Sequence, residues 1–165
     1  MRLPSPSAGA VLGLVCALLA EGCSRKPVQF SRGDRIPLDT YTVTVSYVEA
    51  VQTRPSALDL IVHFRCQDIT SREVTGKFFV MFGGHMSVID SDGNQYAALP
   101  FTLDYYRSHG LSRLGDGRDF SGSSDLSEWV AVAKVPTNSY GFSFLVGNPN
   151  ARPGQPRAAI IPLGR

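Results

Sequence analysis

The sequence predicts an all-β domain, an antiparallel β-sandwich of seven to eight short strands. From residue 41 onward, apolar and polar residues alternate with a period of two in several runs, which is the pattern of strands with one buried face. Gly, Pro, Asn and Asp separate these runs, and no run has the apolar spacing of a helix longer than a turn or two. A chain of 165 residues is long enough for one such domain with its own core.

The first two predicted strands, residues 41–47 and 58–66, alternate most regularly. Pro55 lies in the break between them, and proline has no amide hydrogen to give to a strand ladder. Cys66 is in phase with the apolar positions of the second strand, so we expect a buried and unreactive thiol. His63 is out of phase with those positions and is expected on the opposite face.

Turns that contain glycine separate the next strands. Residues 77–82 are apolar after a lysine and predict a central strand, which a Gly-Gly pair separates from a strand at 85–89. The segment Asp90-Ser91-Asp92-Gly93-Asn94 predicts a hairpin turn that leads into a strand at 95–99.

The last third of the chain begins with an irregular segment. Residues 105–127 contain four glycines among Ser, Asp and Arg residues and predict a long exposed loop. Further strands are expected at 128–135, 140–146 and 158–161. The number and spacing of the strands favour an immunoglobulin-like arrangement of two packed sheets, with a closed barrel as the alternative.

The N-terminus has the features of an export signal. Residues 8–20 form an apolar run of thirteen residues after a positively charged start. A helix that spans a bilayer needs about 20 apolar residues, so this run fits a secretory signal peptide better. The following Leu19-Ala20-Glu21-Gly22 and Cys23 resemble the lipobox of bacterial lipoproteins, with Glu21 standing where a small uncharged residue is usual.

The lipobox resemblance implies cleavage before Cys23 and acylation of that cysteine, with palmitate among the acyl chains, so that the mature chain is anchored to the bilayer. Ser24 stands where many lipoproteins retained in the inner membrane carry Asp, which favours the outer membrane in a Gram-negative cell. The alternative is ordinary cleavage after a small-x-small motif, which would give a secreted or periplasmic protein. We therefore expect a signal peptide at 1–22, a lipidated N-terminus and flexible tether at 23–38, and the sandwich domain at 39–165.

Two motifs carry a further resemblance. The run from Ile89 to Tyr96, with its Asp-x-Asp-Gly turn, and the run from Val132 to Pro136 resemble an uncharacterised family of bacterial exported lipoproteins. The resemblance extends over residues 33–146. It implies an immunoglobulin-like β-sandwich and a place in the cell envelope, and it implies no activity.

The residues predict no enzyme, no cofactor and no nucleic-acid partner. The net charge is +2 and no basic run occurs, so the chain lacks the charge pattern of nucleic-acid binding. His63, His85 and His109 are too scattered for a catalytic triad or for a copper site with Cys66. The turn at Asp90 lacks the glycine and glutamate positions of a calcium loop, so a plain turn is favoured over a metal site.

The favoured function is a membrane-anchored binding or scaffolding module for an envelope protein whose identity the residues do not give. Tyrosine and arginine are enriched at interface hot spots, so the predicted loop offers candidate contacts. These are Tyr105, Tyr106, Arg107, Arg113 and Arg118. The alternative is an envelope protein that binds a small ligand or a metal such as calcium or copper, or an enzyme of an unrecognised type.

Overall fold

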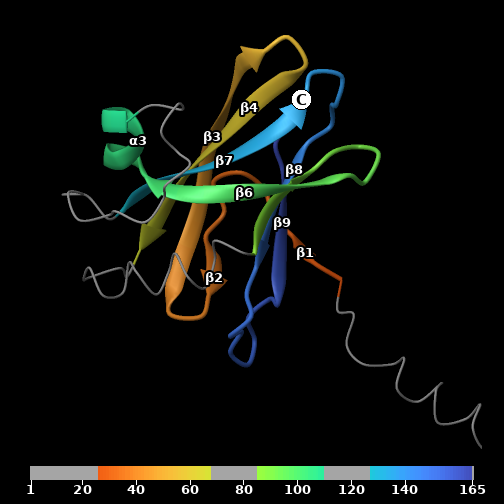
Figure 1. Cartoon of the computed structure of the whole chain (residues 1–165). Helices are drawn as coiled ribbons and strands as arrows, with labels where there is room; N and C mark the ends of the chain where they lie inside the picture. Colours follow the sequence, from red (N-terminus) through yellow and green to blue (C-terminus); the bar gives the residue numbers. More distant parts are fainter. Residues whose placement is uncertain (1–25, 68–84, 110–126, 165) are drawn as a thin grey trace, which may run out of the picture.

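The computed structural model describes residues 26–67, 85–109 and 127–164. The signal peptide, Cys23, the strand predicted at 77–82, and Arg113 and Arg118 lie outside these residues. The described residues form nine strands and one short helix, which are shown in Figure 1. In chain order they are β1 (Val28–Gln29), β2 (Ile36–Leu38), β3 (Tyr41–Arg54), β4 (Ala57–Gln67), β5 (Met86–Ile89), β6 (Gln95–Thr102), α3 (Leu103–His109), β7 (Glu128–Pro136), β8 (Ser143–Gly147) and β9 (Ala158–Pro162).

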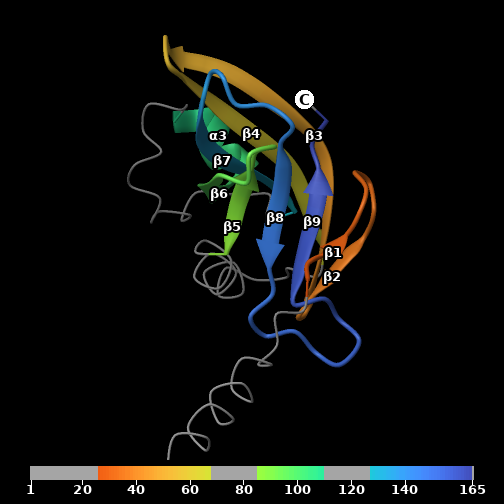
Figure 2. The same ribbon diagram turned by 90° about the vertical axis from the view of Figure 1, so that its right-hand side faces the viewer.

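The strands form one curled sheet in the order β1-β9-β8-β5-β6-β7-β4-β3-β2. Neighbours pair antiparallel, except that β1 and β9 pair parallel. Strand β6 belongs to both halves, because Gln95 to Ala97 pair with β5 and Ala98 to Thr102 pair with β7. The sheet curls, and β8 and β9 come to lie inside the curve of the long β3 (Figure 2). The predicted all-β sandwich is therefore confirmed, with the two layers joined through β6.

The core lies between the two halves of this sheet. Alternate residues of β4 and β7 meet residues of β8 and β9, and all of them are buried. The Phe64 ring stacks on Trp129 with 6.5 Å between ring centroids, and it meets Phe144 from the other half at 6.2 Å. Cys66 belongs to the same cluster, and burial raises the pKa of its thiol well above the usual value. This is the position and the environment expected of an unreactive core thiol.

The helix α3 replaces the first part of the loop predicted at 105–127. The Thr102 hydroxyl accepts a hydrogen bond from the Tyr105 N–H at 3.3 Å, which caps the helix, and Asp104 lies in the first turn. Leu103, Tyr105 and Tyr106 pack against the face of the sheet that points away from the core. The segment is helical because this packing supports it. The glycines of the predicted loop at 105–127 all come after residue 109 and so do not interrupt the helix.

The tether predicted at 23–38 is wrong for residues 28–38. Strand β1 forms one edge of the sheet and β2 the other, so this short segment crosses from edge to edge. Ile36 and Leu38 are fully buried in the core, whereas Pro37 between them is exposed at the edge. Strands of two and three residues are too short to show a periodicity, which is why the sequence did not reveal them.

Strand β3 is twice the predicted length, with 14 residues instead of residues 41–47. Its register with β4 shifts between Val45 and Tyr47, so Ser46 is the extra residue of a β-bulge. The bulge changes the phase of the alternation by one residue. The period-two pattern is therefore interrupted near residue 47, although the strand continues to Arg54.

Candidate binding surface

The strands β3, β4, β7 and β6 present one face to the core and one face to the other side, which we call the outer face. The register defines its rows, because residues that pair across neighbouring strands project to the same side. One row runs Tyr47, His63, Val130, Phe101. The next runs Glu49, Ile61, Val132, Leu99, and a third contains Val51, Asp59 and Lys134.

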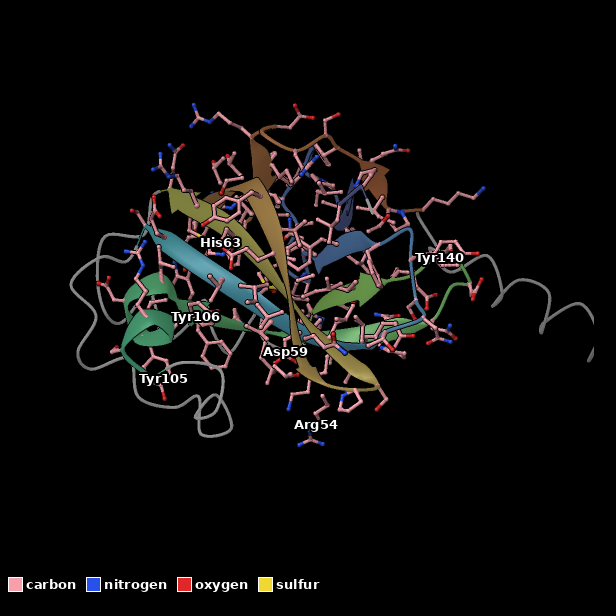
Figure 3. All side chains as sticks on the ribbon, turned by 90° about the horizontal axis from the view of Figure 1, so that it is seen from above. Arg54, Asp59, His63, Tyr105, Tyr106 and Tyr140 are labelled. Atoms are coloured by element: carbon pink, nitrogen blue, oxygen red, sulfur yellow. The ribbon has the colours of Figure 1, made fainter. Side chains whose placement is uncertain are left out.

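The middle of the outer face is a small apolar cluster covered by α3. Ile61, Val130 and Phe101 are buried beneath the helix. The Tyr105 ring stacks on Phe101 with 5.9 Å between centroids, and Tyr106 packs against the same cluster. Figure 3 shows both tyrosines on α3, which packs on β6 and β7.

Around this covered centre the outer face keeps apolar side chains exposed. Tyr47, Val51 and Leu99 have exposed fractions of 47%, 37% and 46%. In the described part of the chain only Val28 and Tyr140 are comparable exposed large hydrophobic residues, and both lie elsewhere. Scattered exposed apolar residues are ordinary, but three at the rim of one sheet face are typical of a contact surface.

Asp59 is the most unusual residue of this surface. It has an exposed fraction of 3%, and its Oδ1 has no hydrogen-bond partner. Its cross-strand neighbours are Val51 and Lys134, and no ion pair joins Lys134 to it among the residues that the structure describes. A buried polar atom without a partner costs about 1–3 kcal/mol, so such an atom calls for a bound partner or water.

His63 is the second buried polar group on this face. Its imidazole stacks on the Tyr47 ring with 4.0 Å between centroids, and its Nε2 lies 3.3 Å from Oε1 of Glu49. This contact is too bent for a hydrogen bond, which leaves Nε2 unsatisfied. Burial lowers the pKa of His63, and the nearby carboxylate of Glu49 opposes that effect in part. His63 is therefore mainly neutral at neutral pH.

The carboxylates of this surface act on its tyrosines. Burial raises the pKa of Tyr106, and the charges of Glu49 and Asp59 raise it further. The pKa of Tyr47 is raised by burial and by Glu49 as well. Arg107 on α3 lowers the pKa of both Tyr47 and His63, so its charge partly offsets the negative potential of the carboxylates.

Among the described residues, one edge of strand β3 beside this face has no partner strand beyond β2. Strand β2 pairs only with residues 41–43, and the Gly33 N–H donates to the Val45 carbonyl at 2.9 Å. Backbone groups alternate sides along a strand, and the bulge at Ser46 shifts that alternation by one residue. The N–H and C=O groups of Val48, Ala50 and Gln52 therefore point away from β4. In the described ranges no other strand pairs with them, and Figure 1 shows the β3–β4 hairpin extending past β2.

The structure brings together only part of the predicted contact set. Tyr105 and Tyr106 are half-buried against the sheet, Arg107 is exposed, and the other two arginines lie outside the described residues. The prediction missed Asp59, Glu49 and Leu99. Alternation along β4 places Asp59 on the side away from the core, but Glu49 faces that side only because of the bulge at Ser46. The burial of Asp59 depends on contacts between strands that the local pattern does not contain.

The Asp90 segment forms the predicted hairpin turn. The two carboxylate oxygens of Asp90 accept hydrogen bonds from the backbone N–H groups of Asp92 and Asn94, the Asn94 amide and the Tyr96 hydroxyl, at 2.8–3.0 Å. These hydrogen bonds lower the pKa of Asp90 to about 2, and the bond from the Asn94 side chain has the largest effect. Gly93 has a φ of 84°, which a turn of this kind requires. A calcium ion bound by Asp90 would have to displace these hydrogen-bond donors from its carboxylate.

The cysteine and the histidines that could have formed a copper site lie apart. Cys66 faces the core and His63 the outer face, while His85 precedes β5 in the other half of the sheet. Within the described residues, no group of three His, Cys, Asp or Glu side chains is arranged to hold a metal. No described helix is long and apolar enough to cross a membrane.

The comparisons bear on the fold. No family model and no curated protein matches the chain. A solved structure of an uncharacterized β-sandwich protein from Clostridium difficile 630 is similar, with a TM-score of 0.51 and 9% identity over 87% of this chain and 98% of that chain. At this identity the likeness concerns the fold alone. It supports a β-sandwich domain of unknown function.

Proposed function

We propose that the chain is a lipid-anchored protein of the cell envelope that binds a partner protein through the outer face of its β-sandwich. The observation that carries the binding part is the outer face itself. It exposes Tyr47, Val51 and Leu99 around two buried polar side chains, Asp59 and His63, each of which has one atom without a hydrogen-bond partner. Exposed apolar side chains close to polar groups that need a partner support this proposal, because protein interfaces combine apolar contacts with hydrogen bonds.

The proposed location in the cell envelope rests on the sequence. The apolar run at 8–20 and the lipobox at Cys23 support export and acylation. Only a few residues separate Cys23 from β1 at Val28, so an acylated chain would hold the domain close to the membrane surface. The outer face belongs to β3, β4, β6 and β7, whereas β1 is at the other edge of the sheet.

Three variants test these parts separately. Cys23→Ala should move the chain from the membrane fraction to the soluble fraction and abolish incorporation of labelled palmitate. Leu99→Asp should remove a partner that is captured by the tagged wild-type chain, because it places a charge among the exposed apolar side chains of the surface. The matched control is Tyr140→Asp, which changes an exposed side chain on another part of the molecule and should leave capture unchanged.

The outcomes test the membrane location and the binding surface separately. Membrane association of Cys23→Ala equal to the wild type would contradict the lipid anchor. Equal capture by Leu99→Asp and the wild type, or equal loss with Tyr140→Asp, would contradict the outer face as the binding surface.

A further inference from the structure

We propose that the outer face binds an extended segment of a partner protein, which pairs as an added strand with the free edge of β3 and places a basic side chain beside Glu49. This inference rests on the proposed function and names how the partner is bound. It is carried by three features: the open backbone groups of β3, the side chains of β3 that lie on the outer face, and the charges of Glu49 on β3 and Asp59 on β4.

The open backbone groups supply the pairing. Val48, Ala50 and Gln52 present N–H and C=O groups at the edge, and side chains of exposed or half-buried residues surround them. An edge of this kind accepts a strand from another chain, and main-chain hydrogen bonds then provide much of the affinity. The regular part of the edge begins after the bulge at Ser46 and ends at the register shift after Gln52. The added strand would therefore contact about six residues, Tyr47 to Gln52.

The side chains define the sequence of the added strand. Its alternate residues would lie on the outer face beside Tyr47, Glu49 and Val51. Tyr47 and Val51 are exposed and favour apolar neighbours, whereas the side chain of Glu49 is 45% exposed and favours a cation. The expected segment is therefore apolar-x-basic-x-apolar. Its central side chain is long enough to approach the carboxylate of Asp59, whose Oδ1 lacks a partner.

The charged groups around this position support a cation. Glu49 and Asp59 contribute negative charge, and Glu128 is already paired with Arg65 at 2.7 Å. Arg107 lies toward Tyr47 and His63, and Lys134 lies across β4 from Val51. No cation of the described residues forms an ion pair with Glu49 or Asp59 apart from the contact with His63, which is mainly neutral.

A second copy of this chain fits the edge less well. Two copies of β3 that pair antiparallel around a two-fold axis must match residues of the same face. Centring the pair on Ala50 places Glu49 opposite Val51, centring it on Glu49 places two carboxylates together, and centring it on Val51 places Glu49 opposite Thr53. None of these registers supplies a cation for Glu49, so a different protein with a basic strand is the better occupant.

The test uses a photoreactive residue at Val51 in the full-length chain, expressed in its own cells and followed by mass spectrometry of the cross-linked peptides. We expect one partner segment with the apolar-x-basic-x-apolar pattern. Glu49→Lys should lower its yield about tenfold or more, and Glu49→Gln should lower it less. Replacing the basic residue of the partner segment with Glu should restore capture by Glu49→Lys.

A second variant examines the backbone pairing. Ala50→Pro removes an edge N–H and leaves the hydrogen bonds to β4, so it should also abolish capture. Thermal unfolding shows whether each variant is folded. If Ala50→Pro is not folded, the yield of the cross-linked segment with Glu49→Gln decides the test instead. The control places the photoreactive residue at Tyr140, where this segment should not be captured.

The outcomes distinguish the inference from the proposed function. Capture from a photoreactive residue at Leu99 but not at Val51 would overturn the added strand and leave the outer face as the binding surface. Capture of a second copy of this chain, or equal capture by Glu49→Lys and the wild type, would also overturn it. Capture from neither position would contradict both proposals.

Discussion

The ring of Tyr47 lies on the imidazole of His63, with 4.0 Å between centroids and 13° between the ring planes. The two residues are directly opposite each other on β3 and β4. Val45 faces the core, so without the extra residue Ser46 the alternation would turn Tyr47 toward the core as well. One bulge therefore places an aromatic residue on the outer face and determines that Val48, Ala50 and Gln52 are the residues whose backbone groups face the edge of β3.

We predict that stability falls on acidification because of His63. Its pKa is below the ordinary value of 6.5, so the unfolded chain binds more protons as the pH falls through that value. The stabilisation is fully present above pH 6.5 and is lost below it. Urea unfolding at pH 7.5 and 5.5 should show a loss in the wild type that is smaller in His63→Gln. Glu49→Gln should enlarge the loss, because Glu49 raises the pKa of His63.

The control for this prediction is His85→Gln, which changes an exposed histidine outside the outer face. It should keep the pH dependence of the wild type. A pH dependence that persists in His63→Gln would assign the effect to another group.

We predict that the segment from Val28 to Leu38 contributes to the stability of the fold. Ile36 is fully buried, so Ile36→Ala should lower the free energy of unfolding by about 2–5 kcal/mol. Val28 is 49% exposed, and Val28→Ala should change it by less than about 0.5 kcal/mol. Equal and small effects in chemical unfolding would restore the interpretation of this segment as a tether.

We predict that Asp90 stabilises the turn between β5 and β6 in its charged form. Its pKa of about 2 lies below the ordinary value of 3.8, so its stabilisation is present above pH 4 and is lost as the pH falls toward 2. Asp90→Ala should lower the urea midpoint more than Asp92→Ala, whose backbone N–H donates to Asp90. A midpoint of Asp90→Ala that equals the wild type would contradict the role of the four hydrogen bonds.

Most of the fold could be predicted because most strands are long enough to alternate. The strands at 57–67, 86–89, 128–136 and 158–162 start and end within about two residues of the expected positions. Three features could not be predicted. Strands β1 and β2 are too short, α3 needs the sheet beneath it, and a bulge at Ser46 is a property of the pairing with β4.

The binding surface was predicted less well than the fold. Tyrosine and arginine content directed attention to residues 105–118, and among the described ones Tyr105 and Tyr106 pack on the outer face. The alternation does predict that Asp59 and His63 face away from the core. Their burial and missing hydrogen bonds depend on contacts between distant segments, which no local pattern contains.

Amide hydrogen exchange of β3, measured residue by residue by NMR in the chain without added partner, tests the open edge most directly. We expect fast exchange at Val48, Ala50 and Gln52, and slow exchange at Glu49 and Val51, whose N–H groups face β4. Slow exchange at all five residues would show that the edge is already paired, and it would contradict the edge as a binding site.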